Sequence, residues 1–289
     1  MNAHLPSYII LTDHGHAPRM LASRDIRKGN PIMSYSAHLC ILDANADIAR
    51  VAHSCIPNAF QHWDPDAHEM VLRAIEDISE GTEITISYEQ DIETFLMPKF
   101  ERMQHTRQSF GLLSTCTCRA CGPSHVQHGT DDFLRLETAE LLELITPLPL
   151  LDDDFELSIH TTHINLRQLQ RLHERYIENL IKLGAKDHKL CHAYWLLYQF
   201  HAYIADHADN EETRSTCEKC DFPIHPLTHL EIAVVALKSA IDICVTCYGK
   251  QHHKVQELEQ EMQELKYKVV DALSKHFHRN RSVSEYPKD

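Results

Sequence analysis

The sequence lacks any uninterrupted apolar run long enough to cross a bilayer, which excludes a membrane-spanning helix. It is also poor in basic residues, since 28 Lys and Arg stand against 42 Asp and Glu for a formal net charge of -14. Nonspecific nucleic-acid binding is therefore disfavoured, because phosphate contacts need a basic face. The same acidic charge suits a basic peptide as a partner.

A signal peptide is also missing, because residues 1–11 have neither a basic start nor a hydrophobic core. Ten cysteines without an export signal indicate a reducing compartment, so we expect metal-bound or free thiols and a cytoplasmic or nuclear location. A hydrophobic content of 43% indicates an ordered, globular chain. Its 289 residues leave room for one large domain or two ordinary ones.

Three of the cysteines form a C-x-C-x2-C run: Cys116, Cys118 and Cys121. One tight loop of this spacing presents three thiolates to a single tetrahedral ion, usually zinc, and a closed site needs a fourth ligand. Disulfide-linked or merely buried thiols are disfavoured, because packing rarely explains three cysteines in six residues. The candidates for the fourth ligand are Cys55, His105, His125 and His128. The loop-like Ser54–Pro57 favours Cys55, because a thiol on a loop can turn toward a distant partner.

Two segments of alternating apolar and polar residues, Met70–Ala74 and Ile84–Tyr88, predict strands. Ser79–Thr82 supplies a turn between them, with Gly81 available for a positive φ. The two strands therefore predict a hairpin. Tyr88 ends its second strand, where the phenol can face a pocket.

These motifs together resemble a SET domain, the fold of protein lysine methyltransferases, and most closely its SET/MYND-type branch with fungal relatives. The family has an Asn-His-Ser-Cys-x-Pro-Asn motif, matched by Ala52–Asn58, a hairpin ending in Ser-Tyr, and a C-x-C-x2-C post-SET loop. The resemblance covers roughly the first half of the chain. It implies that Cys55 completes the zinc site and that Tyr88 is the catalytic tyrosine. Histidine titrates near neutral pH, so His53, next to the pocket, is a candidate acid or base.

The pocket for S-adenosylmethionine (SAM) departs from the family pattern. Ala17, Pro18 and Arg19 stand where the family has a Gly-x-Gly that lets the backbone approach SAM. Ala52 replaces an asparagine whose amide hydrogen-bonds SAM, and alanine offers neither donor nor acceptor. Asn58 keeps the family residue at the edge of this vestigial SAM site. SAM binding is therefore doubtful.

Two further departures concern the walls of the pocket. Only a short segment lies between Pro31 and Val51, where the family usually inserts a helical segment that helps to form the peptide groove. Ser114 stands two positions before the first loop cysteine, where the family usually has an aromatic residue. The zinc loop and the core hairpin survive while the pocket changes, which indicates a retained fold and a lost cofactor.

The predicted fold class is α+β: a SET-like β-clip of short strands with a post-SET zinc loop, followed by an all-helical, tetratricopeptide-like domain. We expect residues 1–122 to form the degenerate SET and post-SET part, 123–131 a linker, 132–278 the helical domain and 279–289 a mobile tail. A first strand is expected at Tyr8–Leu11 and an amino-terminal hairpin over Arg19–Ile32. Helices are predicted over 102–113, 132–145, 163–183, 189–207, 226–248 and 252–276. Gly184 is a plausible C-cap.

Cys217 and Cys220, followed by His225 and His229, have a loose zinc spacing. A second zinc site is one interpretation, and ordinary thiols beside helices are the favoured one.

Three hypotheses for function follow. The favoured one is a SAM-independent enzyme that performs acid–base chemistry of the isomerase or cyclase type on a small molecule in the vacated pocket. Tyr88, His53 or Arg19 would act there as donors or acid–base groups. The alternative is a divergent SAM-dependent protein lysine methyltransferase acting on a basic peptide. The third is a non-catalytic interaction protein with a zinc-stabilised platform. The substrate and the oligomeric state do not follow from the sequence.

Overall fold

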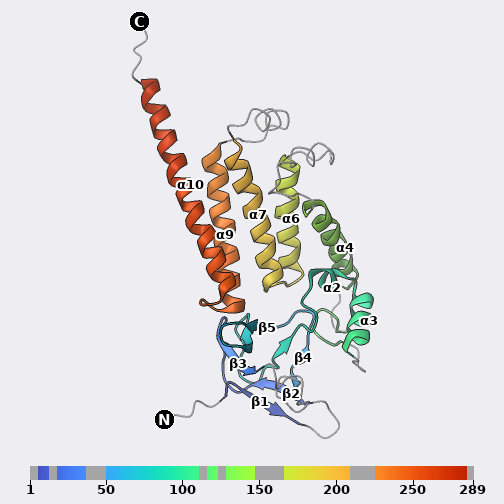
Figure 1. Cartoon of the computed structure of the whole chain (residues 1–289). Helices are drawn as coiled ribbons and strands as arrows, with labels where there is room; N and C mark the ends of the chain where they lie inside the picture. The colour runs from blue at the N-terminus through green and yellow to red at the C-terminus, as the bar shows by residue number, and fades with distance from the viewer. Residues whose placement is uncertain are drawn as a thin grey trace, which may run out of the picture. The chain divides into compact units, whose positions relative to one another are not determined.

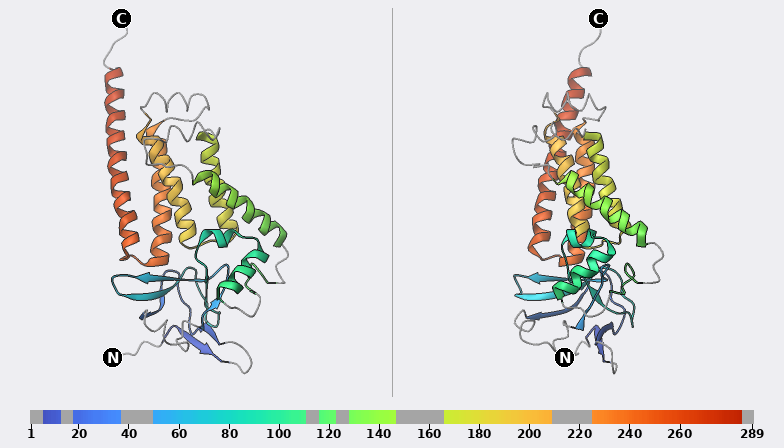
Figure 2. Two further views of the ribbon diagram at one scale, coloured as in Figure 1. Left: turned by 45° about the vertical axis from the view of Figure 1, so that its right-hand side comes forward. Right: turned by 90° about the vertical axis from the view of Figure 1, so that its right-hand side faces the viewer.

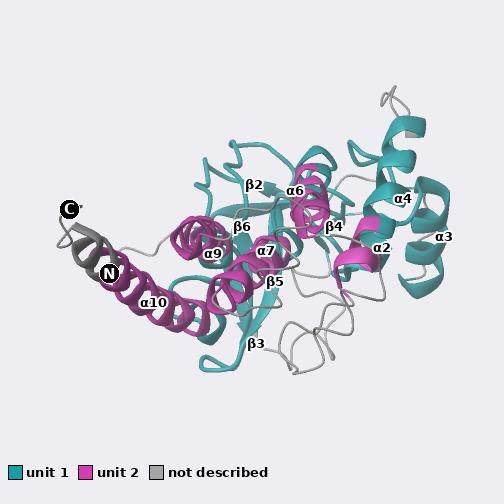
Figure 3. Ribbon diagram, turned by 90° about the horizontal axis from the view of Figure 1, so that it is seen from above, with its two compact units in different colours: residues 1–140, 179–190, 242–255 teal, residues 141–178, 191–241, 256–289 magenta. Residues whose placement is uncertain are grey.

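The structure of the chain, a computed structural model, describes residues 6–12, 18–36, 50–110, 116–122, 128–146, 166–208 and 225–284. Two compact units share the chain, and each is built from several stretches of it (Figure 3). Unit 1 comprises residues 1–140, 179–190 and 242–255, and unit 2 comprises 141–178, 191–241 and 256–289. The division of the chain at residues 122 and 132 stays a prediction.

The described residues of unit 1 form three small sheets. In the first, β1 (Tyr8–Leu11) pairs antiparallel with β2 (Arg19–Ala22). The second has the order β3-β6-β5 and consists of the antiparallel strands β3 (Pro31–Ser36), β6 (Glu69–Ala74) and β5 (Ala59–Asp64). The third is a short parallel pair, β4 (Ala52–His53) and β7 (Thr85–Ile86). The strand predicted at Tyr8–Leu11 is confirmed.

The core of these sheets is aliphatic, with Met20, Leu72 and Ile84 fully buried at its centre. Alternation along β6 buries Leu72 and Ala74 on this side, as expected for a strand in which successive side chains point to opposite faces. Tyr88 packs against the same cluster from its edge. Buried aliphatic side chains therefore support the tyrosine.

The predicted hairpin over residues 70–88 is wrong. Both strands exist, but β6 pairs with β3 and β5 while β7 pairs with β4. The connection between them bonds elsewhere: Ile78 bridges Ile26, and Gly81 donates its N–H to the Ala22 carbonyl at 2.8 Å. Gly81 does adopt the expected positive φ, at 79°. The alternating pattern predicted the strands correctly, but it could not identify their partners.

The amino-terminal hairpin predicted over Arg19–Ile32 is wrong for the same reason. Its two strands, β2 and β3, belong to different sheets. Gly29 adopts a φ of 83°, which lets the chain turn from one sheet toward the other, since glycine takes a positive φ without steric cost.

Helices make up most of the remaining described chain (Figures 1 and 2). Their bounds are α2 Ile92–Leu96, α3 Lys99–Phe110, α4 His128–Ile145, α6 Leu166–Lys182, α7 His188–Asp206, α9 Pro226–Tyr248 and α10 His253–Ser284. The predicted helical segments are confirmed within a few residues, except that α10 continues to Ser284, beyond the expected end at His276. Gly184 follows α6 with a φ of 86°, as expected of a C-cap.

Within unit 2, helices α7, α9 and α10 run side by side (Figure 2). The Cys191 thiol on α7 donates to the Ala240 carbonyl on α9, and the Trp195 indole N–H on α7 donates to the Glu261 carboxylate on α10. Their tetratricopeptide-like character stays a prediction. Among the described helices, none combines the length and the apolar composition needed to cross a membrane.

Candidate functional site

Four sulfur atoms gather in unit 1. The Sγ atoms of Cys55, Cys116, Cys118 and Cys121 all lie within 4.8 Å of one another, and Cys55 and Cys121 are buried. Cys55 comes from the loop after β4, and the other three come from the loop that follows α3 in the chain. This is the only group of three or more potential ligands of this kind within the described ranges, and it consists of the four cysteines that the sequence analysis expects at a zinc site.

The loop that carries three of these cysteines is tightly turned. The backbone N–H groups of Cys121 and Gly122 both donate to the Cys118 carbonyl, at 2.9 and 2.7 Å. A Cβ at position 122 would lie 3.1 Å from the Thr117 carbonyl oxygen, so glycine is the residue that fits there. The turn brings the three thiols to one side, where Cys55 meets them.

The sulfur geometry fits zinc. Cys55 Sγ lies 3.6 Å from Cys121 Sγ, and two thiolates of a tetrahedral zinc site with Zn–S bonds of about 2.3 Å are about 3.8 Å apart. Without a cation the four groups compete for protons: hydrogen bonds from the other three sulfurs raise the pKa of Cys55 and lower the pKa of Cys118. A divalent cation removes that conflict, because all four can then ionise.

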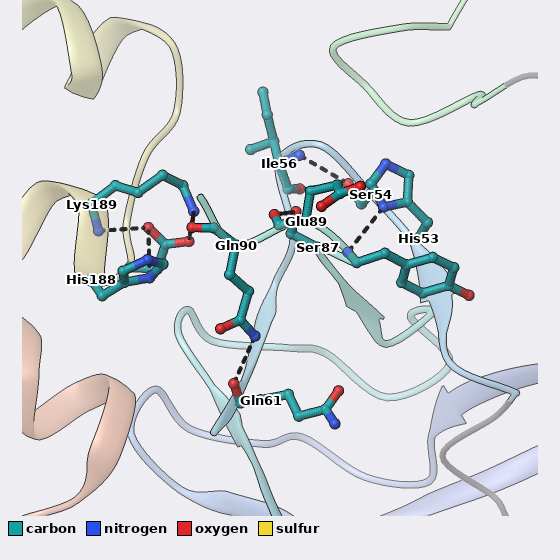
Figure 4. Close-up of polar contacts among 11 residues, drawn as sticks. His53, Ser54, Ile56, Gln61, Ser87, Glu89, Gln90, His188 and Lys189 are labelled. Carbon is teal, nitrogen blue, oxygen red and sulfur yellow. Dashed lines mark hydrogen bonds and ion pairs between the residues drawn. The ribbon is translucent and has the colours of Figure 1, made fainter. Parts of the chain in front are cut away.

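His53 connects the sulfur cluster to Tyr88. Its Nδ1 accepts the backbone N–H of Tyr88 at 3.2 Å (Figure 4). Its Nε2 lies 3.5 Å from Cys55 Sγ. Because Nδ1 accepts, the neutral ring carries its proton on Nε2 and donates it toward the sulfur. Burial lowers the pKa of His53, which keeps the ring in this neutral form.

Arg102 approaches the cluster from α3. Its guanidinium is buried, donates from Nη2 to Cys121 Sγ at 3.5 Å, and donates from Nη1 to the Met97 carbonyl. A fixed positive charge beside thiolates stabilises their ionised form. The sequence does not predict this role of Arg102, because an arginine on a polar helix gives no signal that it points inward.

The Tyr88 side chain is half-buried beside this assembly. Its hydroxyl donates to the Val51 carbonyl at 2.8 Å, and its ring meets the Phe110 ring edge-on with centroids 5.3 Å apart. Burial raises the pKa of Tyr88, so the phenol is neutral in the physiological range. A phenol has one proton to donate, so in this arrangement its oxygen meets a ligand as an acceptor.

The residues assigned to the vestigial SAM site differ in their burial and in their contacts. Ala52 is on β4, opposite Thr85 of β7, with only a methyl group as its side chain. Asn58 is buried, and its amide donates to the Glu83 carbonyl and accepts the Thr85 N–H, both at 2.8 Å. Arg19 is exposed at the start of β2. Ala17 lies outside the described residues, as do Ser114, His125, Cys217 and Cys220.

The structure therefore places His53 against Cys55 of the sulfur cluster and Tyr88 against His53, and Ala52 precedes His53 on β4. His105, a candidate fourth ligand, contacts Glu89 instead, at 3.0 Å. His229 forms a buried contact with His201, at 2.9 Å between the two Nδ1 atoms. The backbone of β4 and β7 joins the two halves of the site, since the Ser54 N–H donates to the Ile86 carbonyl at 2.8 Å.

Comparison with known proteins agrees with this geometry. The family model for the SET domain matches residues 46–89, the segment that carries His53, Cys55 and Tyr88. A SET and MYND domain-containing protein of Dictyostelium discoideum is 35% identical over 71 residues, which are 25% of this chain and 19% of that relative. The chain thus spans about a fifth of the relative's length. The segment that matches the SET-domain model is therefore the one that carries Tyr88 and supplies one sulfur of the four-cysteine cluster.

Proposed function

We propose that this SET-fold protein acts without SAM, as an enzyme that performs isomerase- or cyclase-type acid–base chemistry on a small molecule. The observation that carries the proposal is Ala52. It occupies the motif position where the SET resemblance expects an asparagine that binds SAM, and its methyl group can form no hydrogen bond. Isomerisation and cyclisation rearrange bonds and protons within one substrate, so they need no co-reactant.

Tyr88 is the residue that contacts the substrate in this proposal. Its proton is committed to the Val51 carbonyl, and its oxygen accepts a hydrogen bond from an O–H or N–H group of the substrate. The neutral phenol orients that group, and when its own proton leaves the Val51 carbonyl the hydroxyl can transfer it as the acid or base of the reaction. Such a role depends on a single hydroxyl.

His53 supports this role rather than transferring protons itself. Both of its ring nitrogens have partners inside the protein, the Tyr88 N–H and Cys55 Sγ. We therefore refine the expectation of an acid or base at this position: His53 holds the Tyr88 backbone and orients Cys55.

Zinc has a structural role in the proposal. Cys55, Cys116, Cys118 and Cys121 would hold it, and four protein ligands leave no open position for a substrate. Bound zinc supplies a cross-link between two loops that are about sixty residues apart in the sequence.

A SAM-dependent lysine methyltransferase that acts on a basic peptide is the second candidate. Two observations favour it: Tyr88 follows β7 as the resemblance expects, and the Dictyostelium relative is named for its SET and MYND domains. An oxygen that accepts a hydrogen bond also suits the orientation of a lysine amine.

Calorimetric titration of the zinc-loaded protein with SAM and with S-adenosylhomocysteine separates the two candidates. We expect no binding of either ligand by the parent protein, and measurable binding by Ala52→Asn if this contact is the principal loss. Micromolar binding by the parent protein would contradict the proposal and support the methyltransferase.

Tyr88→Phe is the matched variant for either activity, because it removes one hydroxyl and keeps the ring that packs on Phe110. Once a substrate is known, we expect this variant to lose most of kcat. An unchanged kcat would exclude Tyr88 from the mechanism and favour a non-catalytic interaction protein.

A further inference from the structure

The segment that follows Tyr88 is fixed by polar contacts from several elements (Figure 4). The Gln90 side chain donates from Nε2 to the Gln61 carbonyl on β5, at 2.8 Å. Asp91 then caps α2, since its Oδ1 accepts the Thr94 N–H at 2.6 Å. The backbone between Tyr88 and α2 is thus held at successive residues.

A buried ion pair lies against this segment. The Asp187 and Lys189 side chains are each only 4% exposed, and Lys189 Nζ lies 2.7 Å from Asp187 Oδ2. Asp187 also accepts the Lys189 backbone N–H at 3.2 Å, which places its carboxylate at the start of α7 where the helix dipole favours negative charge. Asp187 therefore fixes both the backbone and the ammonium group of Lys189.

The ammonium group of Lys189 reaches across to the tyrosine segment. Nζ donates to the Gln90 carbonyl at 3.4 Å and lies 5.5 Å from the centroid of the Phe95 ring in α2. The Phe95 ring also has the Arg135 guanidinium 4.8 Å from its centroid, and Arg135 donates to the Phe95 carbonyl. Two buried cations therefore hold the stretch between Tyr88 and the end of α2.

Stability alone does not explain the Asp187–Lys189 pair. Removing two charges from water costs several kcal/mol per ion, and apolar residues of similar size often give equal or greater stability. A buried pair is better explained by the position that it imposes on its neighbours. Here the neighbours are the Gln90 carbonyl, two residues after Tyr88, and the first helix that follows it.

We propose that Lys189, oriented by Asp187, is a positioning residue for Tyr88. The ammonium group holds the Gln90 carbonyl, and the backbone between the two residues passes this constraint to the phenol. The inference rests on the proposed function only for its catalytic consequence, because the effect on the position of Tyr88 is independent of any substrate.

A neighbouring ion pair supplies the matched control. Lys186, in the same turn before α7, contacts Glu76, and the two side chains are 37% and 31% exposed. This pair does not include the segment from Ser87 to Leu96. Lys186→Met therefore removes a lysine of the same turn while leaving the contacts of Tyr88 intact.

The test is fluorine NMR of protein labelled with 3-fluorotyrosine, in which the Tyr88 resonance is assigned from its absence in Tyr88→Phe. We expect Lys189→Met to displace and broaden this resonance, Lys189→Arg to restore it in part, and Lys186→Met to leave it unchanged. A folded Lys189→Met variant with an unchanged Tyr88 resonance would overturn the proposal.

If Lys189→Met does not fold, Asp187→Asn replaces it, because asparagine keeps the helix cap and removes only the negative charge. An unchanged Tyr88 resonance in that variant equally overturns the proposal. This readout needs no substrate, so SAM binding by the parent protein would refute the proposed function and leave this result standing. With a substrate in hand, Lys189→Met should lower kcat more than it raises KM.

Discussion

Each compact unit contains a cluster of buried titratable side chains, and the two clusters avoid unpaired buried charge in different ways. In unit 1 four cysteine sulfurs converge within 4.8 Å, with Arg102 and His53 beside them. In unit 2 His201 and His229 meet through their Nδ1 atoms at 2.9 Å, and His173 is buried nearby. Both clusters bring titratable groups out of water.

The clusters differ in how they avoid buried charge. Burial lowers the pKa of His173 to about 4 and, together with the neighbouring His229 and His173, that of His201 to about 3. These imidazoles therefore remain neutral and need no counter-ion. Thiols so close together give either a proton-sharing network or a metal site, and the convergence of four sulfurs on one point favours the metal.

Burial of polar groups therefore has a different consequence for cation binding in each of the two clusters. The histidine cluster is a neutral part of a helical core, and within the described residues both ring nitrogens of His173 lack hydrogen-bond partners. The sulfur cluster offers four ligands that fit a cation, and His53, two residues before Cys55, accepts the Tyr88 backbone N–H. We therefore expect acid to destabilise the protein through the histidine cluster, and a chelator to destabilise it through the sulfur cluster.

The largest expected effect is that of Cys118→Ser. Zinc-finger peptides gain about 10–16 kcal/mol from their metal, so we expect loss of one ligand to abolish stoichiometric zinc and to unfold much of unit 1. Metal analysis by mass spectrometry and circular dichroism measure the two outcomes.

Cys191→Ser is the control for that variant, because Cys191 is a half-buried thiol of unit 2 that bonds the Ala240 carbonyl. We expect it to retain zinc. A Cys118→Ser protein with full zinc content and unchanged stability would refute a zinc site built from four cysteines.

The second prediction concerns acid. The folded pKa of His173, about 4, lies below its unfolded value of about 6.5, so the native state binds fewer protons. The stability that results is complete above pH 6.5 and is lost as the pH falls toward 4, by about 1.4 kcal/mol per pH unit for one histidine.

His173→Phe tests this prediction, since a phenyl ring can fill the place beside Phe200 without titrating. Thermal unfolding at pH 7 and pH 4.5 should show a smaller decrease in the variant than in the parent protein. The exposed His276→Gln serves as the control and should follow the parent. If the unfolding temperature decreased equally in all three proteins, protonation of groups other than His173 would cause the acid sensitivity.

The third prediction tests whether His53 orients Cys55, one of the four cysteines expected to coordinate zinc. His53→Phe removes both hydrogen bonds of the imidazole and keeps an aromatic ring beside Tyr88, whose centroid lies 5.1 Å from that of His53. We expect zinc affinity to fall by about 10–100-fold, as is typical when a partner of a metal ligand is removed. Competition with a chromogenic chelator measures it. Unchanged affinity would show that Cys55 is oriented by its loop alone.

The smallest expected effect on stability is that of Tyr88→Phe. The phenol needs neither a cation nor the loss of a proton, since one carbonyl satisfies it. We expect the free energy of unfolding to fall by about 0.5–1.5 kcal/mol, the usual contribution of one hydrogen bond. Urea denaturation measures this change. A loss of several kcal/mol would mean that the Tyr88 hydroxyl mainly stabilises the fold and is not available to bind a ligand.

The sequence alone predicts the local features of the chain, namely the cysteine turn, the helices and the strands. The C-x-C-x2-C spacing confines three thiols to one turn, so Cys116, Cys118 and Cys121 had to lie close together wherever the loop packed. Helices such as Pro226–Tyr248 were also predicted, because their apolar spacing and ends are properties of neighbouring residues. The strands themselves followed from alternation.

The tertiary structure decided which of these features meet. Residues 70–74 and 84–88 were expected to pair with each other, yet β6 pairs with β3 and β5 because strands from other parts of the chain offer those edges. The Lys189 ammonium bonds the Gln90 carbonyl across 99 positions, and Arg102 turns toward Cys121 from a polar helix. A periodic pattern records only which face of an element is apolar. The partner of a buried charge depends on how the whole chain packs.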